Sequence, residues 1–352
     1  MPNLESRIPN PDLFQIGGQL IAAGETRTVQ IHVANLYTNT PVTLPVRVLR
    51  GKKPGPVMFV SAALHGDEII GVEIIRRVLL SPPLKRLAGT LLAVPVVNTL
   101  AFLHHSRYLP DRRDLNRSFP GSESGSLAAR LAFLFLKEVV GRAQYGIDLH
   151  TGAINRPNLP QIRADLDNPE SLRLAQVFGA PLLLNSEPTK GTLREYTTAK
   201  GIPVLLYESS EALRYDEVCI RIGVRGVLNV MRELAMLPAT KGHARIEKPI
   251  RAASSTWVRA PASGILRAQA ALGDHVRKGE LLGVVGDPLG EVNAPVINSA
   301  DGIVIGRIDL PLVHEGDALF HIARLDETGA RSVVRRVRTE RASRRRRKPA
   351  HL

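Results

Sequence analysis

A histidine and a glutamate three positions apart are the residues of this chain best suited to chemistry. His65 and Glu68 follow the apolar run of residues 57–63 and precede a helical pattern of apolar residues that begins at Ile69. The pair is therefore expected in a loop between a buried strand and a helix, where ligands bind in open α/β sheets. An imidazole and a carboxylate supply two of the three protein ligands in a catalytic zinc site of the two-His, one-Glu type.

His150 is the candidate for the third ligand. It follows the short strand-like segment of residues 145–149, so it is also expected at a strand end. A close pair of ligands and a distant third are common in hydrolytic zinc sites, whose fourth position is left for water. Each pattern alone is weak, because a single histidine at a strand end is more often a hydrogen-bonded structural residue. The interpretation depends on the residues that accompany the three.

Two further polar segments accompany these residues. Arg107 leads into the stretch Asp-Leu-Asn-Arg-Ser-Phe-Pro-Gly, which contains Asn116 and Arg117, and Glu208 ends a later apolar strand. Arginine beside asparagine suits the recognition of a carboxylate, because the guanidinium offers a planar pair of donors. A carboxylate at the end of a buried strand can act as a general base towards water.

Together these motifs resemble those of the succinylglutamate desuccinylase/aspartoacylase family. Four of them occur in the order that the family uses, over roughly residues 40–240: His-Gly-Asp-Glu, Asp-Leu-Asn-Arg-Ser-Phe-Pro-Gly, Asp-Leu-His-Thr-Gly and a late strand-end glutamate. The resemblance implies an α/β, zinc carboxypeptidase-like fold in which helices flank a mixed sheet. It also implies a metal-dependent hydrolase that acts on amide bonds.

The resemblance assigns the metal and the base. His65, Glu68 and His150 match the family's ligands for one zinc ion, and Glu208 matches its general base. Glu211 lies in the same segment and is the alternative base. Glu208 is preferred because it directly follows the apolar strand.

The resemblance also assigns the substrate-binding residues. Arg107 matches the arginine that polarises the scissile carbonyl, and Asn116 and Arg117 match the pair that holds a free carboxylate of the substrate. Asp148 either orients a ligand imidazole or is a structural cap. Residues 158–165 are expected to form a loop that lines the pocket. Within it, Arg163 could bind a second carboxylate of an acidic substrate or be a solvated surface arginine.

The expected reaction is removal of an acyl group from an N-acyl amino acid or a related small molecule with a free carboxylate. Two alternatives remain open. One is a zinc carboxypeptidase that acts on short peptides, and the other is a non-catalytic adaptor that docks partners through a β domain and a basic tail. The complete set of ligands, base and carboxylate-binding pair favours the enzyme over the adaptor.

Composition indicates where such an enzyme would work. The chain has 352 residues, of which 44% are hydrophobic, and a single cysteine, Cys219, so an intrachain disulfide is excluded. Its first residues lack the apolar segment of a signal peptide, and no run approaches the roughly 18 apolar residues that cross a membrane. We therefore expect a cytoplasmic protein without a membrane partner. Assembly as a homo-oligomer stays open.

Strand and helix patterns predict the domain organisation. Alternating strands and helices predict a catalytic domain over residues 1–245, with a β lead-in at about 19–50 in which Pro45 predicts an edge strand. Residues 250–325 read as short strands with a weak internal repeat, which resembles the all-β barrel-sandwich fold of biotinyl and lipoyl domains. The hairpin at 286–291 lacks the lysine that such carriers need, so a carrier role is not expected.

Residues 326–352 form a basic tail. From Arg331 onwards it holds ten lysines and arginines and one acidic residue, and so contributes +9 of the formal net charge of +14. A block of like charges is predicted to be disordered, and it could bind nucleic acid or an anionic surface. No aromatic residues are interleaved for base stacking. A flexible, solubilising extension without a specific partner is the favoured interpretation.

Overall fold

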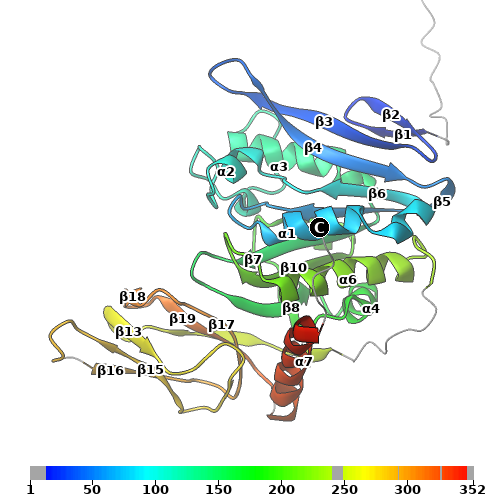
Figure 1. Cartoon of the computed structure of the whole chain (residues 1–352). Helices are drawn as coiled ribbons and strands as arrows, with labels where there is room; N and C mark the ends of the chain where they lie inside the picture. The colour runs from blue at the N-terminus through cyan, green and yellow to red at the C-terminus, as the bar shows by residue number, and fades with distance from the viewer. Residues whose placement is uncertain (1–12, 240–248, 292, 326, 347–352) are drawn as a thin grey trace, which may run out of the picture.

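The computed structural model of the chain describes residues 13–239, 249–291, 293–325 and 327–346. A thirteen-stranded mixed sheet runs through it (Figure 1). Its central strands are parallel, in the order β6 (Ala88–Val94), β5 (Lys53–Ala62), β7 (Tyr145–Gly152) and β10 (Val204–Glu211). Antiparallel neighbours extend it on either side, namely β4 (Pro41–Arg50) and β3 (Thr26–Asn35) beyond β6, and β8 (Asn158–Ala164) beyond β10.

Helices cover both faces of this sheet, as predicted. One face packs against α1 (Ile70–Leu79), α4 (Pro169–Phe178) and α6 (Glu217–Glu233). The other packs against α3 (Leu127–Glu138) and the hairpin of β1 (Leu13–Ile16) and β2 (Gln19–Ala22). Strand β5 serves both cores, because its side chains alternate: Met58 and Val60 face the first and Phe59 the second. Among the described helices, none combines the length and the apolar character needed to span a membrane.

Local sequence signals explain where these helices begin. The Asn168 side chain accepts hydrogen bonds from two backbone N–H groups of the first turn of α4, and Pro169 occupies the first helical position. Asp216 and Ser126 cap α6 and α3 in the same way. These caps accept hydrogen bonds from backbone N–H groups of the first turn, which have no partner inside the helix. Proline suits the first helical position because it has no N–H group that would need such a partner.

Two expectations for strands were wrong. Pro45 does not mark an edge, because β4 lies between β3 and β6; it is tolerated since the pairing of β4 with β6 starts only at Arg47, beyond the proline. Residues 158–165 do not form a loop, because 158–164 are strand β8, which pairs with β10 and, in parallel, with β9 (Leu182–Asn185). The register of β8 against β10 shifts around Pro160, which accommodates the missing N–H there.

The C-terminal strands form two sheets around their own apolar core. β11 (Ile250–Ala252), β12 (Ser255–Arg259), β14 (His275–Val276), β17 (Gly302–Arg307) and β19 (Ala318–Ala323) extend the large sheet. The second sheet contains β13 (Gly264–Ala268), β15 (Leu281–Gly286), β16 (Asn293–Ile297) and β18 (Leu312–Val313). The assignment of this region to the barrel-sandwich fold stays a prediction, and the boundary expected near residue 245 lies outside the described residues.

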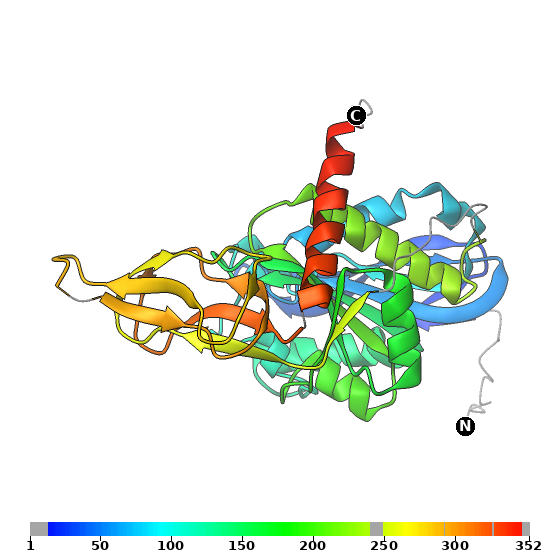
Figure 2. The ribbon, with the colours of Figure 1, turned by 90° about the horizontal axis from the view of Figure 1, so that it is seen from below.

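The basic tail is not disordered over the residues that the structure describes. Residues 327–346 form helix α7 (Glu327–Arg346), which rises beside α6 from the junction with the C-terminal strands (Figure 2). Val333 and Val337, one helical turn apart, are buried in an apolar cluster with residues of β8, β9, β11, β17 and β19. The valines supply the apolar stripe that docks an otherwise charged helix. Residue 326 and residues 347–352 lie outside the described part of the tail.

Docking of α7 can be tested by proteolysis. We expect the double substitution Val333→Asp and Val337→Asp to release the helix, because two charges would replace its apolar anchor. Tryptic cleavage within residues 331–338, followed by mass spectrometry, should accelerate at least about tenfold, since cleavage needs local unfolding. Ala342→Asp, at an exposed position of the same helix, should leave the rate unchanged. Equal rates in all three proteins would contradict the docked helix.

Candidate active site

The loop between β5 and α1 holds His65 and Glu68 against helix α2 (Thr99–Leu103). Gly66, between them, leaves no room for a side chain: an added Cβ would lie 2.1 Å from the backbone carbon of Ala101. This close approach buries both flanking side chains, which are 3% and 2% exposed. The third residue, His150, lies in β7, beside β5 in the sheet. The structure therefore brings His150 next to His65 and Glu68, although 85 positions separate the two histidines in the sequence.

The three side chains converge through defined atoms. Glu68 Oε1 lies 2.6 Å from His65 Nδ1, and Glu68 Oε2 lies 2.8 Å from His150 Nδ1. One nitrogen or oxygen from each residue lies within 4.8 Å of the other two, and all three residues are buried. Among the described residues, this is the one group of histidine, cysteine and acidic side chains with the spacing of a metal site.

The far nitrogen of each imidazole faces another carboxylate. His65 Nε2 lies 3.0 Å from Asp114 Oδ1, and His150 Nε2 lies 2.7 Å from Asp148 Oδ2. Ser61 Oγ donates to the other oxygen of Asp148 at 2.8 Å and fixes that carboxylate in turn. Asp148 thus contacts His150, a candidate metal ligand, as it must if it orients that imidazole and is not only a structural cap. Sequence reasoning missed Asp114, although it begins the motif that contains Asn116 and Arg117.

The electrostatics of this cluster are strongly coupled. Burial opposes ionisation of Glu68, but the charges of His65 and His150 and their hydrogen bonds hold its pKa far below the usual value. Burial likewise disfavours charged imidazoles. The carboxylates of Glu68 and Asp114 nevertheless raise the pKa of His65, and those of Asp148 and Glu68 raise the pKa of His150 well above normal. The pocket is therefore built to hold positive charge between its carboxylates.

These residues fit a zinc ion. When Nε2 of each histidine donates its hydrogen to an aspartate, the lone pair of Nδ1 is directed towards Glu68, which is the arrangement that orients metal-bound histidines. Two imidazole nitrogens and a carboxylate are also a donor set that zinc prefers. We therefore assign His65, Glu68 and His150 as the residues that would hold the ion.

The expected base and the expected polarising arginine both border the cluster. Glu208 lies on β10 in register with His150 on the neighbouring parallel strand, and its carboxylate forms a 2.5 Å ion pair with Arg163 Nε. Arg107 Nη2 donates to Asp114 Oδ2 at 2.8 Å, and its Nη1 lies 3.5 Å from Glu68 Oε1. Both residues line the cavity above the cluster.

That cavity has a volume of about 190 Å³. Its wall contains every residue that the sequence assigned to the metal, the base or the substrate, including Asn116, Arg117 and Arg163, whereas Glu211 does not line it. Asn116 is held in place because its Oδ1 accepts a hydrogen bond of 3.0 Å from the backbone of Leu193. Arg163 comes from strand β8 rather than from a loop.

Arg194 also lines the cavity and was missed. It lies in α5 (Leu193–Ala199), and its guanidinium donates to the backbone carbonyls of Ser186 and Glu187 at 2.6 and 3.0 Å. Burial, together with the nearby charge of Arg163, lowers the pKa of Arg194 to about 10. No motif in the sequence distinguishes this arginine from those on the surface. The fold makes it a fourth guanidinium around the cavity, with Arg107, Arg117 and Arg163.

Comparison with known proteins places this site in a family. The family model described as "Succinylglutamate desuccinylase/Aspartoacylase catalytic domain" matches residues 54–234. The chain belongs to this family. Its members include hydrolases of amide bonds, and the protein is a hydrolase of that kind.

Relatives of this succinylglutamate desuccinylase/aspartoacylase family member include one curated enzyme and several solved structures. N-alpha-acetyl-L-2,4-diaminobutyric acid deacetylase from Halomonas elongata is 26% identical over 82% of this chain and 87% of its own length. A succinylglutamate desuccinylase/aspartoacylase from Rhodobacter sphaeroides is 25% identical, with a TM-score of 0.76 over 86% of this chain and 96% of that one. The product-bound ectoine utilization protein EutE (DoeB) from Ruegeria pomeroyi shares the fold, with a TM-score of 0.78 and 22% identity over 86% and 95% of the two chains.

The role of Asp148 can be measured through metal affinity. Asp148→Asn keeps the size of the side chain but removes the charge opposite His150 Nε2, so we expect zinc to bind about 10- to 100-fold more weakly. Competition with a chromogenic chelator gives the dissociation constant. Asp167→Asn, at an exposed position, is the matched control. An unchanged affinity would make Asp148 a structural cap only.

Proposed function

We propose that the protein is a zinc-dependent deacylase that removes the acyl group from an N-acyl amino acid or a related small molecule with a free carboxylate. The observation that carries this proposal is the buried His65–Glu68–His150 cluster beneath a small cavity that also contains Glu208 and four arginines. A zinc ion held by the cluster would supply the Lewis acidity that activates water and polarises a carbonyl group.

Glu208 is the residue of this chain suited to move the proton. In this proposal its carboxylate takes a proton from the attacking water and returns it to the nitrogen of the leaving amine, as a general base and then a general acid. Its side chain is 16% exposed, so solvent does not fully surround it, and its carboxylate forms an ion pair with Arg163. A base held at a defined place above the cluster needs no rearrangement before the reaction.

Arg107 is placed to stabilise the negative charge that develops on the carbonyl oxygen. Its guanidinium is anchored by Asp114 on one side and lies next to Glu68 on the other. Charge that is oriented before the reaction begins is usually the largest contribution to catalysis. Asp114 thus serves two residues, since it orients both His65 and Arg107.

The size and charge of the cavity favour a small anionic substrate. Its volume of about 190 Å³ is below the roughly 300–1,000 Å³ of common ligand pockets, which favours an N-acyl amino acid over a peptide. Asn116 and Arg117 are assigned to the free carboxylate, because an amide and a guanidinium offer several donors to one acceptor group. Arg163 and Arg194, on the remaining side, would favour a second anionic or polar group.

The names of the relatives agree with this substrate class. The Halomonas elongata relative is a deacetylase of an N-acetylated amino acid, and it aligns with most of this chain. Hydrolysis of short peptides is the alternative reaction, and the small cavity disfavours it. A non-catalytic adaptor is the alternative to an enzyme. It is disfavoured because Glu208 and the arginines of the cavity are all present.

The base can be tested with a matched pair of variants. We expect Glu208→Gln to lower kcat by about a thousandfold or more while zinc still binds, because an amide cannot accept the proton. Glu211→Gln, three residues away and outside the cavity, should retain activity within about twofold. Unchanged turnover in Glu208→Gln would assign the base elsewhere.

Substrate class requires a panel of compounds. N-acetyl and N-succinyl amino acids and short C-terminal peptides would be offered to zinc-loaded and chelated protein, with amine release as the readout. Chelator-sensitive release from the acylated amino acids alone is the expected result. Release from the peptides alone would establish the carboxypeptidase, and no release from any compound by the fully loaded protein would contradict the proposal.

The missed arginine has its own test. Arg194→Gln should raise KM for a substrate with a second carboxylate by roughly tenfold, because one charge-assisted hydrogen bond is lost. KM for an N-acetyl amino acid with an apolar side chain should change little. Equal effects on both substrates would show that Arg194 only stabilises its loop through Ser186 and Glu187.

A further inference from the structure

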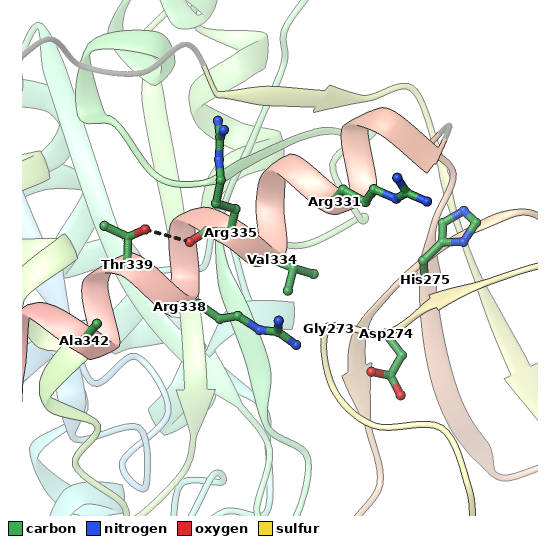
Figure 3. Close-up of a pocket in the computed structure, with 9 residues that line it drawn as sticks. All are labelled: Gly273, Asp274, His275, Arg331, Val334, Arg335, Arg338, Thr339 and Ala342. Carbon is green, nitrogen blue, oxygen red and sulfur yellow. Dashed lines mark hydrogen bonds between the residues drawn. The ribbon is translucent and has the colours of Figure 1, made fainter.

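A groove runs along helix α7, on the side that faces the C-terminal strands (Figure 3). It has a volume of about 600 Å³, and α7 lines one wall with Arg331, Arg335 and Arg338. The opposite wall is the segment Gly273–His275. The three arginines stand four and three positions apart, so their Cα atoms lie on one face of the helix. In Figure 3 the side chains of Arg331 and Arg338 point towards the opposite wall, whereas that of Arg335 points away from it.

The groove is strongly cationic. Arg335 and Arg338 are exposed, and neither forms an ion pair with another described residue. The one carboxylate in the lining, Asp274, already accepts a hydrogen bond of 2.8 Å from the backbone N–H of Ala271. The guanidinium groups of Arg335 and Arg338 are therefore available to an anionic ligand.

A second groove with several arginines flanks α7 on its other side, and one of them, Arg77, pairs with Glu73 and Glu217. It has a volume of about 570 Å³ and is lined by Arg77, Arg221, Arg225 and Arg232 as well as by Thr339, which borders both grooves. Glu340 is the carboxylate of α7 in this lining, and it pairs with Arg225. Arg331, Arg335 and Arg338 thus span about 10 Å of α7, and the arginines of the second groove lie beside Thr339 and Glu340.

The arginines are held on a fixed support. Val333 and Val337 are buried against the sheets, so the opposite face of α7 is presented to solvent in one orientation. A fixed array loses less conformational entropy on binding than a disordered tail would. The structure thus removes the main reason for which a flexible extension without a partner was favoured.

We propose that α7 and its two flanking grooves bind the phosphate backbone of a nucleic acid. Guanidinium groups donate in pairs to phosphate oxygens, and arginines gathered in two adjoining grooves suit a repeating polyanion better than one small anion. Neither groove is lined by a phenylalanine, tyrosine or tryptophan, and His275 is the one ring in the first lining, so the contact is expected to read the backbone and not the bases. The described exposed side chains of α7 include no large apolar group that could insert into a membrane.

The test is binding of the full-length protein to a fluorescein-labelled DNA duplex of about 20 base pairs and to a single-stranded RNA of the same length, followed by anisotropy. The key variant is Arg335→Glu with Arg338→Glu. The matched control makes the same change of charge at Lys85 and Arg86, which are exposed in the 3-10 turn η1 (Pro82–Arg86). The neutral pair Arg335→Gln with Arg338→Gln, far from the catalytic cavity, tests the same contacts without adding negative charge, and so replaces the charge-reversed variant if that protein misfolds.

We expect micromolar or tighter binding of the unaltered protein at about 0.1 M salt, and about 100-fold weaker binding of the charge-reversed variant. The slope of log Kd against log salt should fall by about two, since two phosphate contacts are lost. The neutral pair should change in the same direction, and the control should stay within about threefold. Tighter binding of duplex or of RNA would identify the form recognised.

Three outcomes would overturn the proposal. The first is no binding of either nucleic acid by the unaltered protein at about 0.1 M salt. The second is an equal loss in the control, which would reduce the effect to net charge. The third is binding to vesicles with anionic lipid, or to polyglutamate, that exceeds binding to both nucleic acids. Retained amide hydrolysis in the variants would show that the fold is intact.

Discussion

Burial of the Glu68 carboxylate is the constraint on which the site depends. A fully buried charge is costly unless partners compensate it, and here the partners are His65 and His150. Those imidazoles in turn need acceptors, which Asp114 and Asp148 provide. The cluster thus holds three carboxylates against one guanidinium, that of Arg107. The two remaining negative charges can be neutralised either by a proton on each histidine or by one divalent cation, which explains why the same geometry raises both histidine pKa values and fits zinc.

The parallel centre of the sheet supplies the geometry that this constraint requires. β5 and β7 are adjacent, so the loop after β5 meets His150 on β7, and β10 places Glu208 in register with that histidine. Strand β8 lies antiparallel beside β10 in the sheet and brings Arg163 to within ion-pair distance of Glu208. His150, Glu208 and Arg163 therefore come from three neighbouring strands, and the sheet spacing sets their separation. His65 and Glu68 come from the loop that follows β5, which packs against helix α2.

The metal ligands and base could be proposed from sequence because each lies at a junction between an apolar run and a polar motif. Arg194 could not, because nothing local separates an arginine buried by the fold from one on the surface. Strand β8 was hidden for a related reason: its segment carries Pro160, Gln161 and Arg163, and tertiary contacts override that composition. The contact between Asp114 and His65 Nε2 was missed because the two residues lie in different motifs, 49 positions apart, and only the folded chain brings them together.

Helix α7 shows how a small apolar contribution can outweigh repulsion between charges. Two pairs of its described arginines, Arg331–Arg335 and Arg335–Arg338, stand four and three positions apart, and each such pair costs a few tenths of a kcal/mol. Burial of Val333 and Val337 contributes roughly 2 kcal/mol each. The two valines therefore outweigh this repulsion even before the ion pair of Glu340 with Arg225 is counted. A polyanion that neutralised the arginines would remove the repulsion and strengthen the docking, because any ligand that binds only the docked form stabilises it. Docking of the helix and binding of phosphate are therefore expected to reinforce each other.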